Sequence, residues 1–342
     1  MAKSDVKTKR AGKQKSKTPP LGGLSKTGLA IGTAAIGLAG AALFNFSRAK
    51  AAEGEYPRRG HVTRIDGLDL HHVDSATAGP TVVLLHGNGT TLEDWFACGI
   101  FQELSKTNRV IAFDRPGFGY STRPRRRPWS PAAQADVLAL ALKSLGAADA
   151  TVVGHSFGTL VSIQLGLRHP ELVHTLVLLS GYYYPSARID VLAGSVPAIP
   201  IVGDIDRYTA APLFGAALRP LLERKIFAPA AVASSWSKFP FEMTLRPSQI
   251  RAEAAEAALM VPSAAALVQH YGELTVPVQI ISGEGDRIID HTSQSARLAS
   301  EISAGLTTLR GVGHMVHHTA TDRVLHAIRQ IMSKQSMIAD QD

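Results

Sequence analysis

One serine of the chain lies in a pattern that is typical of an enzymatic nucleophile. Ser156 is the centre of the motif GHSFG at 154–158, between a predicted strand at 151–153 and a predicted helix at 159–167. A serine at so sharp a strand-to-helix turn adopts a strained backbone, and the glycine at each end of the motif removes a side chain that would clash. Such a nucleophile elbow lifts the hydroxyl clear of the sheet and points a helix N-terminus at the reaction centre. This arrangement suits a nucleophile whose product is an oxyanion.

The elements that could hold this turn alternate along the chain. Short apolar runs bounded by Gly, Pro and Asp are separated by helical patterns, which predicts parallel strands covered on both faces. These predicted strands are residues 82–85, 110–113, 151–153, 176–179 and 278–281. An earlier pair, 62–66 and 70–73, predicts a hairpin at the sheet edge. The fold class is therefore α/β, with a mostly parallel central sheet flanked by helices.

With these motifs, residues 62–332 resemble the α/β-hydrolase superfamily. The motif HGNG at 86–89 is similar to the family's HG turn after the third strand. The resemblance implies that the backbone N–H groups of Asn88 and Phe157 form an oxyanion hole. It also places Asp114 in the family's loop after the fourth strand, where we expect it to anchor the turn.

The same resemblance implies the two partners of Ser156. A serine hydroxyl needs a base to accept its proton and a carboxylate to hold that base in the right tautomer. In the family these residues follow the serine in the order acid, then histidine. The motif GEGD at 283–286 is similar to the family's G-x-x-D element, and GVGH at 311–314 follows the last strand. We therefore expect a catalytic triad of Ser156, Asp286 and His314, without a cofactor.

Other acids and histidines compete for these roles. Glu284 and Asp290 do not stand at the sequence position where the family has its acid. His86 is more often structural in this family. His317 and His318 could be mistaken for the base or for a metal pair, but adjacent residues on a helix point different ways, so we expect both on a helix surface. Because no carboxylate clusters with them at ligand spacing, we expect no metal site.

The alternation of strands and helices breaks after the sixth strand, where the family places its cap. Residues 183–274 are rich in Pro, Ala and aromatic residues, and contain no convincing strand. We interpret them as a helical cap inserted into a core formed by 56–182 and 275–334. The aromatic residues predict an apolar lid over the serine, although at least half of them could form the cap's own core.

The nucleophile type narrows the reaction. A serine at position 156 indicates acyl transfer to water, so we expect a carboxylesterase-like serine hydrolase. It would cleave a small-molecule carboxylic ester with an apolar acyl or alcohol group through an acyl-enzyme intermediate. The alternatives are a carbon–carbon bond hydrolase or a lactonase with the same triad, or a non-catalytic ligand receptor of the same fold. The oligomeric state is not indicated by the sequence.

The net charge of +8 is concentrated at the N-terminus. Residues 1–27 hold eight of the 36 basic residues and one of the 28 acidic ones, so they account for seven of the eight net charges. We expect a disordered tail that is solvated or faces a membrane. A nucleic-acid-binding domain usually carries a basic face of its own, so no nucleic-acid partner is expected.

Residues 28–46, directly after this tail, contain no charged residue. Their length is close to the roughly 20 residues that cross a bilayer as a helix. The positive-inside rule keeps the basic tail in the cytoplasm. We therefore expect a single-pass N-terminal membrane anchor with the hydrolase body outside the cytoplasm. The alternatives are secretion after signal cleavage near Ala51 and a buried helix of the main fold.

Overall fold

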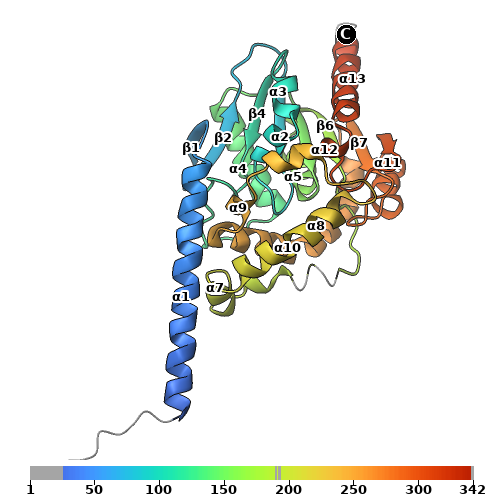
Figure 1. Cartoon of the computed structure of the whole chain (residues 1–342). Coiled ribbons are helices and arrows are strands. Elements are labelled where there is room, and N and C mark those ends of the chain that lie inside the picture. The colour runs from blue at the N-terminus through green and yellow to red at the C-terminus, as the bar shows by residue number, and fades with distance from the viewer. Residues whose placement is uncertain (1–25, 189–190, 192–193, 340–342) are drawn as a thin grey trace, which may run out of the picture. The chain divides into compact units, whose positions relative to one another are not determined.

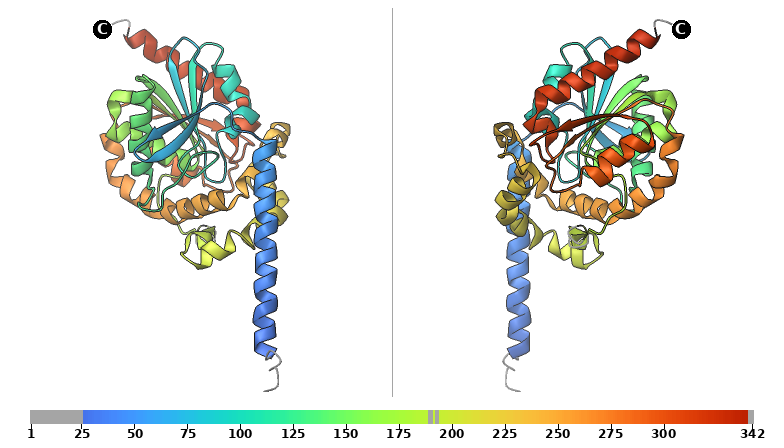
Figure 2. Two further views of the ribbon diagram at one scale, coloured as in Figure 1. Left: turned by 90° about the vertical axis from the view of Figure 1, so that its left-hand side faces the viewer. Right: turned by 90° about the vertical axis from the view of Figure 1, so that its right-hand side faces the viewer.

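Eight strands form one sheet in a computed structural model of the chain, which describes residues 26–188, 191 and 194–339 (Figures 1 and 2). The strands are β1 (His61–Ile65), β2 (Leu68–Asp74), β3 (Thr81–Leu85), β4 (Arg109–Phe113), β5 (Ala150–His155), β6 (Val173–Leu179), β7 (Val278–Gly283) and β8 (Gly305–Leu309). Their order across the sheet is β1-β2-β4-β3-β5-β6-β7-β8. All neighbours from β4 to β8 pair in parallel, whereas β2 is antiparallel to both β1 and β4. The predicted α/β class is confirmed.

Helices cover both faces of this sheet, as the unbroken apolar runs predicted. On β3, Val83 and Leu85 pack with α4 and α5, while Val82 and Leu84 pack on the other face with α2, α3 and α13. The helices of the core are α2 (Glu93–Ala97), α3 (Ile100–Leu104), α4 (Pro131–Ser144), α5 (Phe157–Arg168), α11 (Arg297–Glu301), α12 (Val316–Thr319) and α13 (Thr321–Ala339). Burial on both faces explains why the strands lack polar alternation.

The predicted hairpin is present at the sheet edge, with a tighter turn than predicted. Asp66 and Gly67 both have positive φ, 48° and 75°, which is the geometry of a two-residue hairpin turn. Because this turn closes the chain within two residues, β2 begins at Leu68 and not at Leu70.

Between β6 and β7 the described residues form helices and turns, in agreement with the predicted helical insertion. These elements are η2 (Val196–Ala198), α7 (Val202–Asp206), α8 (Ala211–Phe227), η3 (Ser234–Lys238), α9 (Phe241–Thr244), α10 (Pro247–Leu267) and η4 (Val268–Glu273). We call residues 183–274 the cap; its status as a separate unit stays a prediction.

The helix α1 (Lys26–Glu55) contains the whole apolar segment predicted at 28–46 and continues beyond it. It is long and apolar enough to cross a membrane, which is also true of a signal sequence near an N-terminus. The basic tail predicted at 1–27 lies, apart from its last two residues, outside the described residues.

The C-terminal part of α1 is bonded to the cap. Asn45 is buried, and its Nδ2 donates to the carbonyl oxygens of Tyr208 and Thr209 at 3.0 and 2.8 Å. Arg48 forms an ion pair with Glu242 at 2.6 Å. This end of α1 is therefore part of the folded body.

Candidate active site

Ser156 occupies the junction between β5 and α5 with the strained backbone that its motif predicts. Its φ and ψ are 51° and −119°, outside the regions that residues with a side chain normally adopt. Its N–H donates to the carbonyl of Leu179 at 2.9 Å, which ties the turn to β6. A Cβ on Gly154 would lie 2.7 Å from the Gly158 oxygen, and one on Gly158 would lie 2.7 Å from the His86 oxygen. Both glycines are therefore required by close backbone packing.

His314 and Asp286 are bonded to each other, as expected from the motifs that follow β7 and β8. His314 Nδ1 lies 2.8 Å from Asp286 Oδ2, and both side chains are buried, with 7% and 2% exposed. The other Asp286 oxygen accepts the backbone N–H groups of Ile288 and Ile289 at 2.8 and 3.0 Å. A carboxylate held in this way orients the imidazole, so that Nε2 is left as the proton acceptor.

The two competing carboxylates do not contact His314. Glu284 is 56% exposed and lies 3.9 Å from Arg310. Asp290 accepts the N–H and the hydroxyl of Ser293 at 2.8 and 2.6 Å. Among the described acids, the geometry therefore favours Asp286 as the partner of His314.

The turn at 86–89 lies directly against Ser156. A Cβ on Gly87 would come within 3.2 Å of Ser156 Cβ, so the backbone approaches closely only because this residue is glycine. The N–H of Phe157 is the first of α5 and has no intrahelical partner. These placements agree with an oxyanion hole at Asn88 and Phe157, whose role stays a prediction.

The surroundings of His86 and Asp114 indicate that both residues have structural roles. His86 is fully buried, its Nε2 accepts the Arg115 N–H at 3.0 Å, and burial lowers its pKa to about 3. Asp114 accepts the backbone N–H groups of Leu92 and Tyr120, both at 2.9 Å. Asp114 therefore anchors loops, and His86 remains neutral.

A cavity of about 380 Å³ lies between the core and the cap at this point. Asn88, His155 and His314 line it from the core. The cap contributes three of its aromatic side chains, Trp236, Phe239 and Phe241. Two other aromatic residues of the cap lie elsewhere: Phe227 is fully buried and Phe214 is 66% exposed. Part of the aromatic set therefore lines the cavity, and a lid over Ser156 stays a prediction.

The comparisons with known proteins identify the family of the chain. The family model described as alpha/beta hydrolase fold matches residues 80–321, more than half of the chain. The chain belongs to the α/β-hydrolase family. A 2-hydroxymuconate semialdehyde hydrolase from Pseudomonas sp. (strain CF600) is 35% identical over 125 residues, which cover 35% of this chain and 44% of that protein. The matched segments span about half the length of the first curated relatives.

Two solved structures show the likeness of fold. An enol-lactonase from Burkholderia xenovorans LB400 has a TM-score of 0.65 and 21% identity, covering 80% of this hydrolase and 100% of the lactonase. A membrane phospholipase A, described as a bacterial virulence factor, has a TM-score of 0.62 and 19% identity, covering 90% and 96%.

This α/β hydrolase also contains a buried cluster that contradicts the sequence prediction. His317 and His318 lie in the interior, not on a helix surface, with side chains that are 0% exposed. The two oxygens of Asp94 lie 3.1 and 2.7 Å from the Nε2 atoms of His317 and His318. The possible ligand atoms of the three side chains lie within 4.8 Å of one another, which is close enough to hold a metal ion. Each carboxylate oxygen, however, already lies within hydrogen-bond distance of one imidazole nitrogen. A carboxylate does therefore cluster with these histidines, against expectation.

Nothing in the sequence around Asp94 distinguishes it from an ordinary acidic residue in the first turn of a helix. The ring of His155 lies 5.0 Å from that of His314 and 4.3 Å from that of His317, between the two regions. The cluster is thus a neighbour of the candidate site, one layer deeper in the core.

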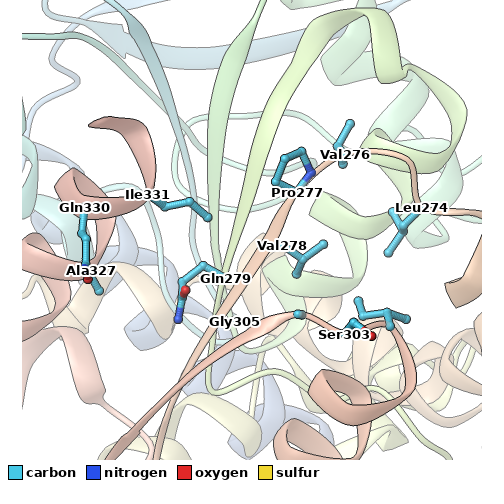
Figure 3. A pocket seen from close by; sticks show the side chains of 12 residues that line it. Leu274, Val276, Pro277, Val278, Gln279, Ser303, Gly305, Ala327, Gln330 and Ile331 are labelled. Atoms are coloured by element: carbon cyan, nitrogen blue, oxygen red, sulfur yellow. The ribbon is translucent and has the colours of Figure 1, made fainter. Parts of the chain in front are cut away.

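A second cavity, of about 310 Å³, lies at the opposite end of the sheet (Figure 3). It is lined by residues at the starts of β7 and β8, such as Val278 and Gly305, and by Gln330 of α13. None of the candidate residues lines it. Ligands of open parallel sheets bind at the carboxyl ends of the strands, where Ser156 lies, so this cavity is not the candidate site.

Proposed function

We propose that this protein is a serine hydrolase in which Ser156 attacks the carbonyl carbon of an apolar small molecule. The observation that carries the proposal is the bond between His314 and Asp286, which lies beside the cavity and at the carboxyl ends of the strands, where Ser156 joins β5 to α5. His314 Nε2 takes the hydroxyl proton, and Asp286 stabilises the imidazolium that forms. The N–H groups of Asn88 and Phe157 bind the oxyanion. Collapse of the oxyanion breaks the bond to the leaving group, which takes the proton from His314, and leaves the acyl group on Ser156. Water then gives a proton to His314 as it attacks the acyl carbon, and the acid is released as Ser156 recovers its proton.

The similar proteins favour a substrate in which a carbon–carbon bond or the ester bond of a lactone is cleaved. The curated relative with 35% identity is a hydrolase of 2-hydroxymuconate semialdehyde, and a lactonase shares the fold. We therefore rank these substrates above the open-chain carboxylic ester that we expected from the sequence. The ester remains the second candidate, because a phospholipase shares the fold over 90% of this chain.

A substrate panel separates the two candidates. Purified protein is offered a vinylogous diketone, an enol lactone and para-nitrophenyl esters of rising chain length, each at several concentrations. We expect the highest kcat/KM for the diketone or the lactone, and Ser156→Ala is the matched control for non-enzymatic turnover. If a para-nitrophenyl ester gave the highest kcat/KM, the ester would replace them as the substrate class.

We propose further that α1 is an uncleaved membrane anchor, with the hydrolase body outside the cytoplasm. The basic tail before it favours this orientation. A signal cut near Ala51 would remove Asn45 and Arg48, which bond the cap in the folded body. These contacts argue for retention of the helix.

The anchor is tested by isolating membranes and measuring the intact mass of the protein found there. We expect the uncut chain in the membrane fraction and digestion of its body by protease added from the non-cytoplasmic side. A soluble product that starts near Ala51 would support secretion instead, and an uncut chain in the cytosolic supernatant would exclude both.

A further inference from the structure

One carboxyl group of the cap faces the candidate site. Glu253 of α10 lines the same cavity as Asn88 and His314. Its Oε1 would lie 3.2 Å from a Cβ on Gly89, so the carboxyl group sits directly over the HG turn. The Glu253 backbone oxygen accepts a hydrogen bond from Asn88 Nδ2 at 3.1 Å, which fixes this turn of α10 to the proposed oxyanion residue.

Other charged side chains of the cavity have partners. Arg219 Nε lies 2.7 Å from Glu223 Oε1, and the same oxygen accepts Trp236 Nε1–H at 2.9 Å. The Arg219 guanidinium also stacks over Phe241, 4.4 Å from the ring centre. Within the described lining, Glu253 is the carboxyl group for which the structure offers no ion pair.

The surroundings of Glu253 disfavour its charge. One turn further along α10, Glu256 is fully buried in an ion pair with Arg115 at 2.5 Å, and Arg123 lies 3.7 Å from the same oxygen. These arginines are therefore engaged by Glu256. Burial and the negative charge of Glu256 raise the pKa of Glu253 to about 7. The remaining titratable groups of the cavity are His155, whose pKa burial holds well below its usual value, and His314.

A protonated carboxyl group can donate a hydrogen bond, whereas an ionised one only accepts and repels anions. We propose that Glu253 forms a selectivity subsite of the active-site cavity, which accepts a neutral polar or cationic group beside the Asn88–Gly89 turn and rejects an anionic one. The subsite deepens the proposed function and rests on it. The rejection concerns only a carboxylate that lies beside the Asn88–Gly89 turn, and not one bound elsewhere in the cavity. A substrate that places its carboxylate at this turn is then poor above neutral pH and improves as Glu253 takes up its proton.

Two activated esters of equal chain length test the subsite. Para-nitrophenyl butyrate is neutral, and the para-nitrophenyl monoester of succinate replaces its terminal methyl by a carboxylate. Activated aryl esters acylate a nucleophilic serine whichever bond the natural substrate contains. The measured quantity is the ratio of kcat/KM for succinate to that for butyrate. The pH dependence of the shared acylation step affects both esters and cancels in this ratio.

For the wild type we expect the ratio to rise on the order of tenfold from about pH 8 to about pH 5.5, because Glu253 becomes neutral while the succinate carboxylate stays ionised. Glu253→Gln should have the high ratio at both pH values, since it mimics the protonated acid. Glu273→Gln, a change at an exposed residue of the same segment, should behave as wild type. If the ratio for Glu253→Gln changed with pH as it does in the wild type, the proposal would be overturned.

Failure of the proposed function would look different. The wild type would then hydrolyse neither ester and would not be labelled by a fluorophosphonate, and the subsite would be rejected together with the triad. Labelling of the wild type with a flat ratio in both proteins would reject the subsite alone.

Discussion

Two histidine–aspartate pairs lie close together in this protein and differ in what surrounds them. In one, His314 bonds Asp286 at 2.8 Å and lines the cavity under the cap. In the other, Asp94 is paired with His317 and is also bonded by His318. The ring of Trp95 lies 5.2 Å from that of His317, and the ring of Trp236 lies 5.2 Å from that of His318. The hydrogen-bond chemistry is the same. What differs is access, since only the first pair has an imidazole that reaches substrate space.

The comparison of the two pairs depends first on Ser156, because the proposed role of His314 is to accept the proton of the Ser156 hydroxyl group. Ser156→Ala should keep the fold and lose activity by a factor on the order of a million, the scale for removal of a nucleophilic serine from a triad. Hydrolysis rates and fluorophosphonate labelling measure this loss, and circular dichroism checks the fold. Labelling of the variant at the wild-type rate would move the nucleophile elsewhere.

The pair that lines the cavity should control activity without controlling stability. Asp286→Asn is expected to lower kcat by about ten-thousandfold, because the amide no longer holds His314 in the required tautomer. The unfolding free energy should change little by comparison. Glu284→Gln and Asp290→Asn are the matched controls, since neither side chain contacts His314, and both should keep most activity. If Glu284→Gln were the inactive variant, the acid would have to be reassigned.

The buried pair around Asp94 should control stability without controlling activity. Asp94→Asn is expected to lower the free energy of unfolding by about 3 kcal/mol, because two buried imidazole groups lose a charged acceptor. Activity per folded site, counted by fluorophosphonate titration, should stay within about tenfold of wild type by comparison with triad losses. Denaturant unfolding and active-site titration measure the two effects. A stable but inactive Asp94→Asn would join the two pairs into one functional network.

The smallest expected effect is the pH dependence of stability that the buried region causes. Burial lowers the pKa of His317 and holds that of His155 well below its usual value, so the folded protein favours the neutral form of both. In the unfolded chain they take up protons below about pH 6.5, so each reduces stability by up to about 1.4 kcal/mol per pH unit on acidification. This stability is present above that pH and is lost as the pH falls.

His317→Gln should lose less stability than wild type between about pH 7.5 and pH 5.5, by up to about 1 kcal/mol, since one titrating group is gone. Denaturant unfolding at the two pH values measures the difference. His270→Gln removes an exposed histidine and should leave the slope unchanged. Equal slopes for wild type and His317→Gln would show that His317 is protonated in the folded state.

The difference between the two pairs also explains how far the sequence could predict the site. Ser156, Asp286 and His314 each stand in a local motif beside a strand end, and a parallel sheet brings strand ends together, so the bond between His314 and Asp286 was expected. Asp94 lies 223 residues before His317 in the chain, and no motif links them. Helix periodicity alone predicted that His317 lies on a helix surface. This prediction was wrong because periodicity cannot indicate which neighbouring element covers a short helix. The same holds for Glu253, whose place over Gly89 depends on how the cap packs.

The insertion of the cap has a consequence for the order in which the protein folds. Ser156 precedes the cap in the chain, whereas Asp286 and His314 follow it, so the pairing of β6 with β7 must close a loop from Leu179 to Val278. Closing a flexible loop of about 100 residues costs roughly 4 kcal/mol of chain entropy, and doubling its length would add only about 0.6 kcal/mol. During synthesis the proposed nucleophile therefore leaves the ribosome well before its proposed base, and we expect the site to become reactive only when the last strands dock. A cap of another length would delay that moment without greatly weakening the finished fold.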